Sequence, residues 1–165
     1  MGSLFCFGQN ENRNIYPSNS IFVELAGNSI FYGSINYERV FVHNPNIYLT
    51  GRFGVGYGSF AGLSILSGPT LINGIFKIHK SIAFETGIGV AFMQVGREGE
   101  AYSGMNWTYE FQIAPTAQAG LRVQSQNGFL FRLCFTPFIA ALQASNSTYK
   151  FYPSVGMSFG YSFGK

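Results

Sequence analysis

The stretch from Ser154 to Phe163, S-V-G-M-S-F-G-Y-S-F, decides the fold class. Alternation of side chains with a period of two is typical of a β-strand that has two different faces. The positions on the other face are serine or glycine. The bulky positions are Val155, Met157, Phe159, Tyr161 and Phe163. One face of this strand is therefore large and apolar, and the other is small and polar.

The composition of the 165-residue chain agrees with such strands and excludes other classes. Aromatic residues make up 18% and charged residues only 10%, against about 25% charged residues in an average soluble protein. A hydrophobic content of 47% excludes a disordered chain. No stretch approaches the roughly 18 to 20 apolar residues that a membrane-spanning helix needs. These numbers predict a membrane protein that faces lipid through β-strands.

The same alternation recurs along the chain and predicts an all-β fold of about eight strands. Turn-forming residues separate several of these segments, as in His43-Asn44-Pro45-Asn46 and Ser125-Gln126-Asn127-Gly128. The predicted strands cover 19–28, 31–42, 46–58, 69–79, 81–94, 109–124, 128–139 and 152–163. Segments of this length match the 9 to 11 residues with which a tilted strand crosses a bilayer. We expect a transmembrane antiparallel up-and-down β-barrel with a closed polar lumen.

The connections are expected to differ at the two ends of this barrel. Short turns alternate with longer loops, which we place near 59–68, 95–108 and 140–151. Outer-membrane barrels have short periplasmic turns and longer extracellular loops. An even number of strands then places both termini on the periplasmic side.

Strand parity predicts which side chains fill the lumen. An eight-stranded barrel has an interior only just wide enough for side chains, so the small residues are expected inside and the bulky ones outside. Nearly every charge within a strand falls on the inward face, and Arg39 is the clear exception. The predicted lumen ion-pair network consists of Glu24, Glu38, Arg52, Lys77, Glu85, Arg122 and Arg132.

This network has two interpretations. It forms either a gated polar pathway or proton relay, or a structural plug that fills and rigidifies the lumen. We favour the plug because so few strands leave no room for a continuous column of water.

Domain organisation is simple. Residues 1–8 are interpreted as a signal-peptide remnant or as added residues, residues 9–18 as a polar periplasmic lead-in, and residues 19–163 as the barrel. The two cysteines, Cys6 and Cys134, predict neither a disulfide framework nor a zinc site. The net charge is +3 and the basic residues are scattered, so nucleic-acid binding is not expected.

Residues that would carry catalysis are scarce. The chain contains no aspartate, and both histidines, His43 and His79, fall in predicted periplasmic turns. We therefore predict neither catalytic residues nor a cofactor or metal site. Possible contacts at the outer rim are Arg97, Glu100, Tyr102, Trp107 and Tyr109. For Trp107 and Tyr109, membership of the aromatic girdle at the lipid interface is the favoured interpretation.

The residues also carry a family resemblance. F-V-E-L-A-G-N (22–28) followed by S-I-N-Y-E-R-V-F (34–41) resembles the opening hairpin of small outer-membrane β-barrel proteins of Gram-negative, Bacteroidota-type bacteria. The last strand is similar to the C-terminal signal that the barrel-assembly machinery reads, and its signal residues are Gly156, Phe159, Tyr161 and Phe163. The resemblance implies an outer-membrane location, with lipid and the assembly machinery as partners. It implies little about activity, because a fold does not fix a function.

The function expected from the sequence is non-catalytic. We expect an integral outer-membrane barrel that acts as a structural or interaction component, or as an accessory subunit of a larger outer-membrane complex. The alternative is a narrow channel or transporter of small or hydrophobic molecules, and a lipid-modifying enzyme comes third.

Overall fold

The computed structural model describes residues 17–29, 33–44, 46–60, 62–99, 106–140 and 150–164. These residues form one antiparallel sheet of ten strand segments and a single 3-10 turn, η1 (Gly27–Ser29). The strand segments are β1 (Asn19–Ala26), β2 (Gly33–His43), β3 (Ile47–Phe60), β4 (Leu63–Lys77), β5 (Ile82–Gly99), β6 (Asn106–Gln124), β7 (Phe129–Phe135), β8 (Phe138–Ala140), β9 (Lys150–Tyr152) and β10 (Val155–Phe163). Within the described ranges, no helix has the length and apolar character needed to cross a membrane.

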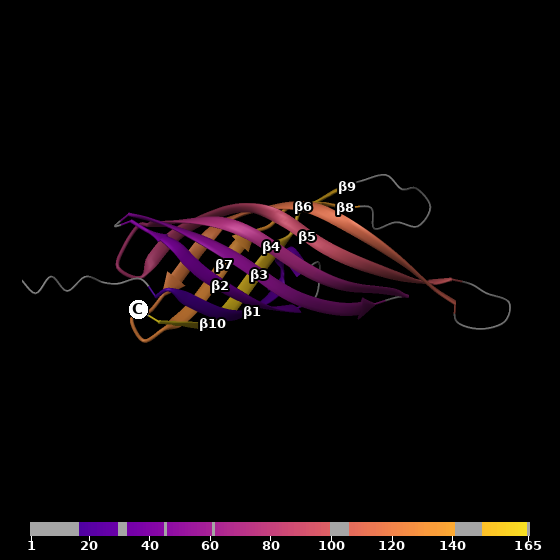
Figure 1. Ribbon diagram of the computed structural model, residues 1–165, viewed down its shortest axis with the longest axis horizontal. Coiled ribbons are helices and arrows are strands. Elements are labelled where there is room, and N and C mark those ends of the chain that lie inside the picture. Colours follow the sequence, from indigo (N-terminus) through magenta and orange to yellow (C-terminus); the bar gives the residue numbers. More distant parts are fainter. Residues whose placement is uncertain are drawn as a thin grey trace, which may run out of the picture.

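The sheet closes into a barrel of eight strands (Figure 1). Closure follows because β10 pairs with both β1 and β7, while β6 pairs with both β5 and β7. The segments β7 and β8 form one strand interrupted near Pro137, and β9 and β10 form another interrupted near Pro153. The backbone N–H of Thr136 donates to the carbonyl of Ser154 over 2.7 Å, so the two interruptions lie side by side. The predicted eight-stranded antiparallel barrel is confirmed.

The strand register gives the stagger of the barrel. Successive pairing partners lead around the sheet from Ser20 through Glu38, Arg52, Leu71, Gly89, Thr116 and Phe138 to Tyr152. Ser20 itself pairs with Ser162. The circuit that leaves Ser20 therefore arrives at Tyr152, whereas the direct partner of Ser20 on that same strand is Ser162. The ten residues between these two positions are the shear of the barrel. Shear and strand number together fix the tilt of the strands and the narrow diameter.

Side chains alternate between the two faces as the sequence predicts. The outward positions of β1, such as Ile21 and Leu25, are about half exposed, whereas Phe22 and Glu24 between them are buried. Where strands approach closely, only glycine fits the inner face. A Cβ at Gly160 would overlap the backbone oxygen of Ile21 and the side chain of Phe22. The barrel thus presents apolar side chains outward.

The start of β1, the end of β10 and three turns lie at one end of the barrel, called the turn end below. Backbone hydrogen bonds join neighbouring turns there, from Lys77 to Asn46 over 3.2 Å and from Gln124 to Ser81 over 2.8 Å. The first strand begins and the last strand ends at this end of the barrel, since Asn19 pairs with Phe163. The opposite end is called the loop end.

The predicted loops 59–68 and 95–108 are wrong in extent. The β3 strand continues to Phe60 and β4 begins at Leu63, so residues 59–68 are mostly paired strand. The β5 strand reaches Gly99 and pairs with β6 back to Asn106. The prediction bounded strands by alternation and turn-forming residues, whereas backbone pairing continues past those boundaries. Figure 1 shows the β5–β6 hairpin extending past the rest of the barrel.

The interior has three layers rather than a uniform lining of small residues. A charged layer occupies the middle, and apolar side chains fill the lumen on both sides of it. The turn-end apolar layer consists of Val40, Tyr48, Ile75 and Ala83. The loop-end apolar layer consists of Ile65, Ala91, Met93, Val95, Ala114, Phe138 and Ala140. The expectation that small residues line the whole lumen is therefore wrong in both apolar layers, which contain large side chains such as Tyr48, Met93 and Phe138.

Candidate functional site

The charged layer contains three carboxylates and three guanidinium groups, each on a different strand. All six residues are at most 1% exposed. They are Glu24 on β1, Glu38 on β2, Arg52 on β3, Glu85 on β5, Arg122 on β6 and Arg132 on β7. Because buried charges must be paired, equal numbers of the two signs allow the layer to be neutral as a whole.

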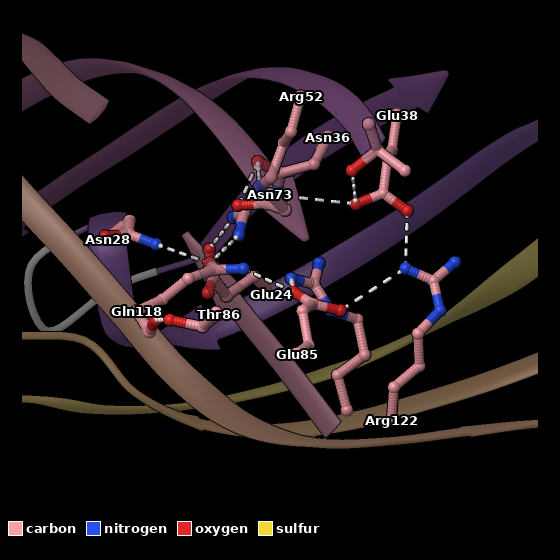
Figure 2. Close-up of polar contacts among 12 residues, drawn as sticks. Glu24, Asn28, Asn36, Glu38, Arg52, Asn73, Glu85, Thr86, Gln118 and Arg122 are labelled. Atoms are coloured by element: carbon pink, nitrogen blue, oxygen red, sulfur yellow. Dashed lines mark hydrogen bonds and ion pairs between the residues drawn. The ribbon is translucent and has the colours of Figure 1, made fainter. Parts of the chain in front are cut away.

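Arg52 anchors the first group of contacts, which lies toward the loop end. Its guanidinium forms an ion pair with Glu24. Arg52 Nε donates to Asn36 Oδ1 over 3.0 Å, and Nη1 donates to Gln118 Oε1 over 3.1 Å. Figure 2 shows these side chains converging from β1, β2, β3 and β6. This group therefore ties together strands on both sides of the lumen.

Arg122 anchors the second group, nearer the turn end. Its Nη1 lies 2.5 Å from Glu38 Oε1 and 3.3 Å from Glu85 Oε2. The other oxygen of Glu38 accepts hydrogen bonds from Thr50 Oγ1 over 3.2 Å and from Asn73 Nδ2 over 3.3 Å. Both oxygens of Glu38 are thus satisfied (Figure 2).

Phe22 joins the two groups, and sequence reasoning missed it. Arg132 and Arg52 lie over its ring, 4.6 Å and 5.0 Å from the centroid. Arg132 also forms an ion pair with Glu85. Guanidinium groups are attracted to an aromatic face, so Phe22 supports two cations with one side chain. The sequence feature that could have identified Phe22 is its position on the inward face of β1, between the outward Ile21 and Val23.

A second missed feature is η1, which turns the chain into the lumen. Ala26 and Gly27 have φ angles of 57° and 67°. Beyond them Asn28 is buried, and its Nδ2 donates to Gln118 Oε1 over 3.4 Å. Thr116 Oγ1 donates to Asn28 Oδ1 over 2.6 Å. The turn therefore covers the charged layer on its loop side. The sequence feature that could have predicted this turn is the turn-forming pair Gly27-Asn28 directly after β1.

Lys77 does not join the charged layer. It is half-buried at the end of β4, and its Nζ lies 5.1 Å from the centroid of the Tyr48 ring. The structure thus brings together six of the seven residues predicted for the network. Side-chain alternation correctly predicted that Lys77 points inward, but alternation does not determine its height along the barrel axis.

At the loop-end rim, the predicted contact Arg97 forms an ion pair with Glu110, a residue that the sequence did not single out. Arg97 Nη1 lies 2.6 Å from Glu110 Oε2, and this hydrogen bond and charge hold the pKa of the Glu110 carboxyl below its ordinary value. The predicted contact Tyr109 is 61% exposed. Trp107 belongs to β6, but its side chain lies outside the described residues, as do Glu100 and Tyr102.

The predicted assembly-signal residues alternate as expected on β10. Phe159, Tyr161 and Phe163 are exposed outward, and Gly156 is buried against η1. His43 and His79 are both exposed at the turn end. Among the described residues no group of three or more side chains is arranged to hold a metal ion.

An eight-stranded antiparallel barrel with an apolar exterior and a polar lumen layer is the fold of the small outer-membrane β-barrel proteins. Solved structures of this class share the fold. The attachment invasion locus protein Ail of Yersinia pestis matches with a TM-score of 0.56 and 11% identity, over 90% of this chain and 100% of Ail. Neisserial surface protein A matches with a TM-score of 0.52 and 9% identity, over 88% of this chain and 94% of that protein.

The N-terminal barrel domain of Pseudomonas aeruginosa OprF matches with a TM-score of 0.51 and 10% identity, over 88% of this chain and all of the domain. At these identities the likeness shows the fold alone. No family model matches the sequence, and no curated protein matches it. The resemblance to Bacteroidota-type barrels stays a prediction.

Proposed function

We propose that this protein is a non-catalytic barrel of the bacterial outer membrane that serves as a structural or interaction component, with its lumen closed to solutes. The observation that carries the proposal is the stacking of three interior layers. A solute would have to pass the ion pairs of Arg52 and Arg122, η1 and two apolar layers. The names of the matched proteins agree with it, since one is called the attachment invasion locus protein and another a surface protein.

The interaction surface that we propose is the projecting β5–β6 hairpin at the loop end. Its outward face exposes Tyr109 and Phe111, which are 61% and 68% exposed. In the proposed orientation the turn end and both termini face the periplasm, and this hairpin faces the cell exterior. A larger outer-membrane complex and the barrel-assembly machinery are the proposed partners, the latter through β10.

A planar lipid bilayer tests the closed lumen. The purified full chain should insert without steady single-channel conductance. The comparison variant replaces both members of one ion pair by alanine, at Glu24 and Arg52, and should raise the frequency of small current steps. Steady conductance of the wild-type protein would refute the closed-lumen proposal.

One observation favours the narrow channel as a second candidate. Arg132 Nε and Nη1, although buried, have no hydrogen-bond partner among the described residues. Unsatisfied buried donors are sites where ordered water is expected. Steady, cation- or anion-selective conductance that the Arg132→Met substitution alters would support this candidate over the plug.

A further inference from the structure

Arg39 is unusual because it carries a charge on the outside of the barrel. Among strand residues whose side chains are described, it is the only Lys, Arg, Asp or Glu at an outward position. On the same strand Phe41, two residues nearer the turn end, is 55% exposed. Arg39 thus lies inside the apolar rim of the lipid-facing surface. A cation at such a depth is unfavourable unless it reaches a polar partner.

No partner for Arg39 is present in the described part of the protein. Its neighbours in register are Asn19 on β1 and Gly51 on β3. Neither bears a charge, and the position at Gly51 is covered by the ring of Phe41, which a Cβ there would meet at 3.7 Å. The guanidinium makes neither an ion pair nor a hydrogen bond to another described residue. An anionic group from outside the protein therefore has an electrostatic reason to bind at Arg39.

Two neighbouring side chains add hydrogen-bonding capacity. The Tyr37 hydroxyl donates to Asn19 Oδ1 over 2.6 Å. This bond occupies the amide oxygen of Asn19 and leaves its Nδ2, a donor, without a partner among the described residues. Cross-strand neighbours lie about 4.5 to 5.5 Å apart at Cβ, so the donors of Asn19 and Arg39 share one small area. Grouped donors around a guanidinium are suited to a phosphate group.

The charge at the turn end also favours an anion. Lys80 is exposed there, and Lys77 is half-buried nearby. The described carboxylates lie elsewhere: Glu24, Glu38 and Glu85 are in the lumen, and Glu110 is at the loop-end rim. The described part of the turn end therefore has no acidic side chain to oppose the cations. A one-sided potential of this kind attracts anionic lipid headgroups.

From these contacts we propose that Arg39, with Asn19 held by Tyr37, binds the headgroup phosphate of an anionic phospholipid in the leaflet at the turn end. The depth of Arg39 within the apolar rim favours a lipid over a soluble anion or an acidic protein segment. The inference rests on the proposed insertion in a membrane and adds a lipid class to it.

Native mass spectrometry tests this site. The full chain is reconstituted in nanodiscs that contain equal amounts of phosphatidylglycerol and phosphatidylcholine, and the lipids retained after release are counted. The wild-type protein should retain phosphatidylglycerol preferentially. Arg39→Gln should lower that preference about fivefold, the effect of one basic residue near an anionic surface. Tyr37→Phe should lower it less, because it only frees the Asn19 amide to rotate.

The matched control is Lys150→Gln, which removes an exposed cation at the loop end. It should leave the lipid preference unchanged. An unchanged preference in Arg39→Gln, or an equal fall in Lys150→Gln, would overturn the site. Failure of the proposed insertion has a different signature: the wild-type chain would then not migrate faster on an unheated SDS gel.

Discussion

Arg122 on β6 and Glu38 on β2 form an ion pair of 2.5 Å between strands on opposite sides of the barrel. Three strands separate β2 from β6 in either direction around the sheet. The pair therefore spans the diameter of the lumen and fixes the distance between two walls that share no backbone hydrogen bond. Its contribution to stability is accessible to mutation.

Removal of one partner of this pair should strongly destabilise the barrel. Glu38→Gln leaves the buried layer with one cation in excess, because Arg122 must then share Glu85 with Arg132. Breaking a buried pair typically costs about 3 to 5 kcal/mol. Unfolding by urea in lipid vesicles measures the change. The double variant Glu38→Gln, Arg122→Met should recover part of the loss, because no unpaired charge remains. A double variant as unstable as the sum of the two single changes would contradict the pairing.

The rim pair Arg97–Glu110 should behave differently, because the side chain of Glu110 is 54% exposed. Its pKa is lowered in the folded protein by the hydrogen bond and charge of Arg97. The pair therefore stabilises the fold above the unfolded-state pKa of Glu110, and this contribution is lost as the pH falls through the lower folded-state pKa. NMR titration of the Glu110 carboxyl measures it directly.

In the same titration Arg97→Gln should move the Glu110 pKa back toward its ordinary value, and added salt should do so in part. Global stability should hardly change in Glu110→Gln, since exposed pairs contribute little. A titration that is identical with and without Arg97 would show that the rim pair does not form.

The inward turn at η1 predicts different responses of two glycines to alanine. Gly27 has a φ of +67°, and a Cβ there would lie 2.6 Å from Glu24 Oε1. Gly27→Ala should therefore be destabilising, by about 1 to 3 kcal/mol for the strained conformation, with displacement of Glu24 in addition. Urea unfolding of the refolded barrel is the measurement.

Gly33→Ala is the matched control, because a Cβ at Gly33 meets its nearest atom, the Glu24 carbonyl oxygen, at an ordinary 3.6 Å. It should leave stability unchanged or slightly raise it. Equal effects of the two substitutions would show that η1 does not occupy the lumen.

Cys134 reports on access to the lumen. It is buried on β7 two residues from Arg132, with 4% exposure. In a Cys6→Ser background, a water-soluble maleimide should leave Cys134 unmodified in the folded barrel and modify it after unfolding. A cysteine introduced at the exposed turn position Gln126 should react at once. Rapid labelling of Cys134 in folded protein would indicate an aqueous path through the lumen.

The sequence predicted strand number and the side of each charge well, because both follow from side-chain alternation. Glu24, Glu85 and Arg132 lie inward for the same reason that Ile21 and Phe84 lie outward. Alternation is a local property, so a single strand carries it. The order of the strands then follows from the simple succession of hairpins.

What the sequence did not predict depends on height along the barrel axis. Side-chain alternation predicted that Lys77 points inward. The stagger between neighbouring strands places it nearer the turn end than the charged layer, beside Tyr48. The pairing of Arg122 with both Glu38 and Glu85 depends on the same stagger. The Asn28 contacts depend on two positive φ angles at Ala26 and Gly27, which no periodicity reveals.

The ion pairs also bear on the order of events in biogenesis. Their partners come from distant parts of the chain, as with Glu38 and Arg122, 84 positions apart. Before the first and last strands meet, these side chains would face an open sheet, and in hydrocarbon each unpaired charge is strongly unfavourable. In the membrane proposed for this protein, a partly wound sheet would therefore be unfavourable in the bilayer interior until its edges join.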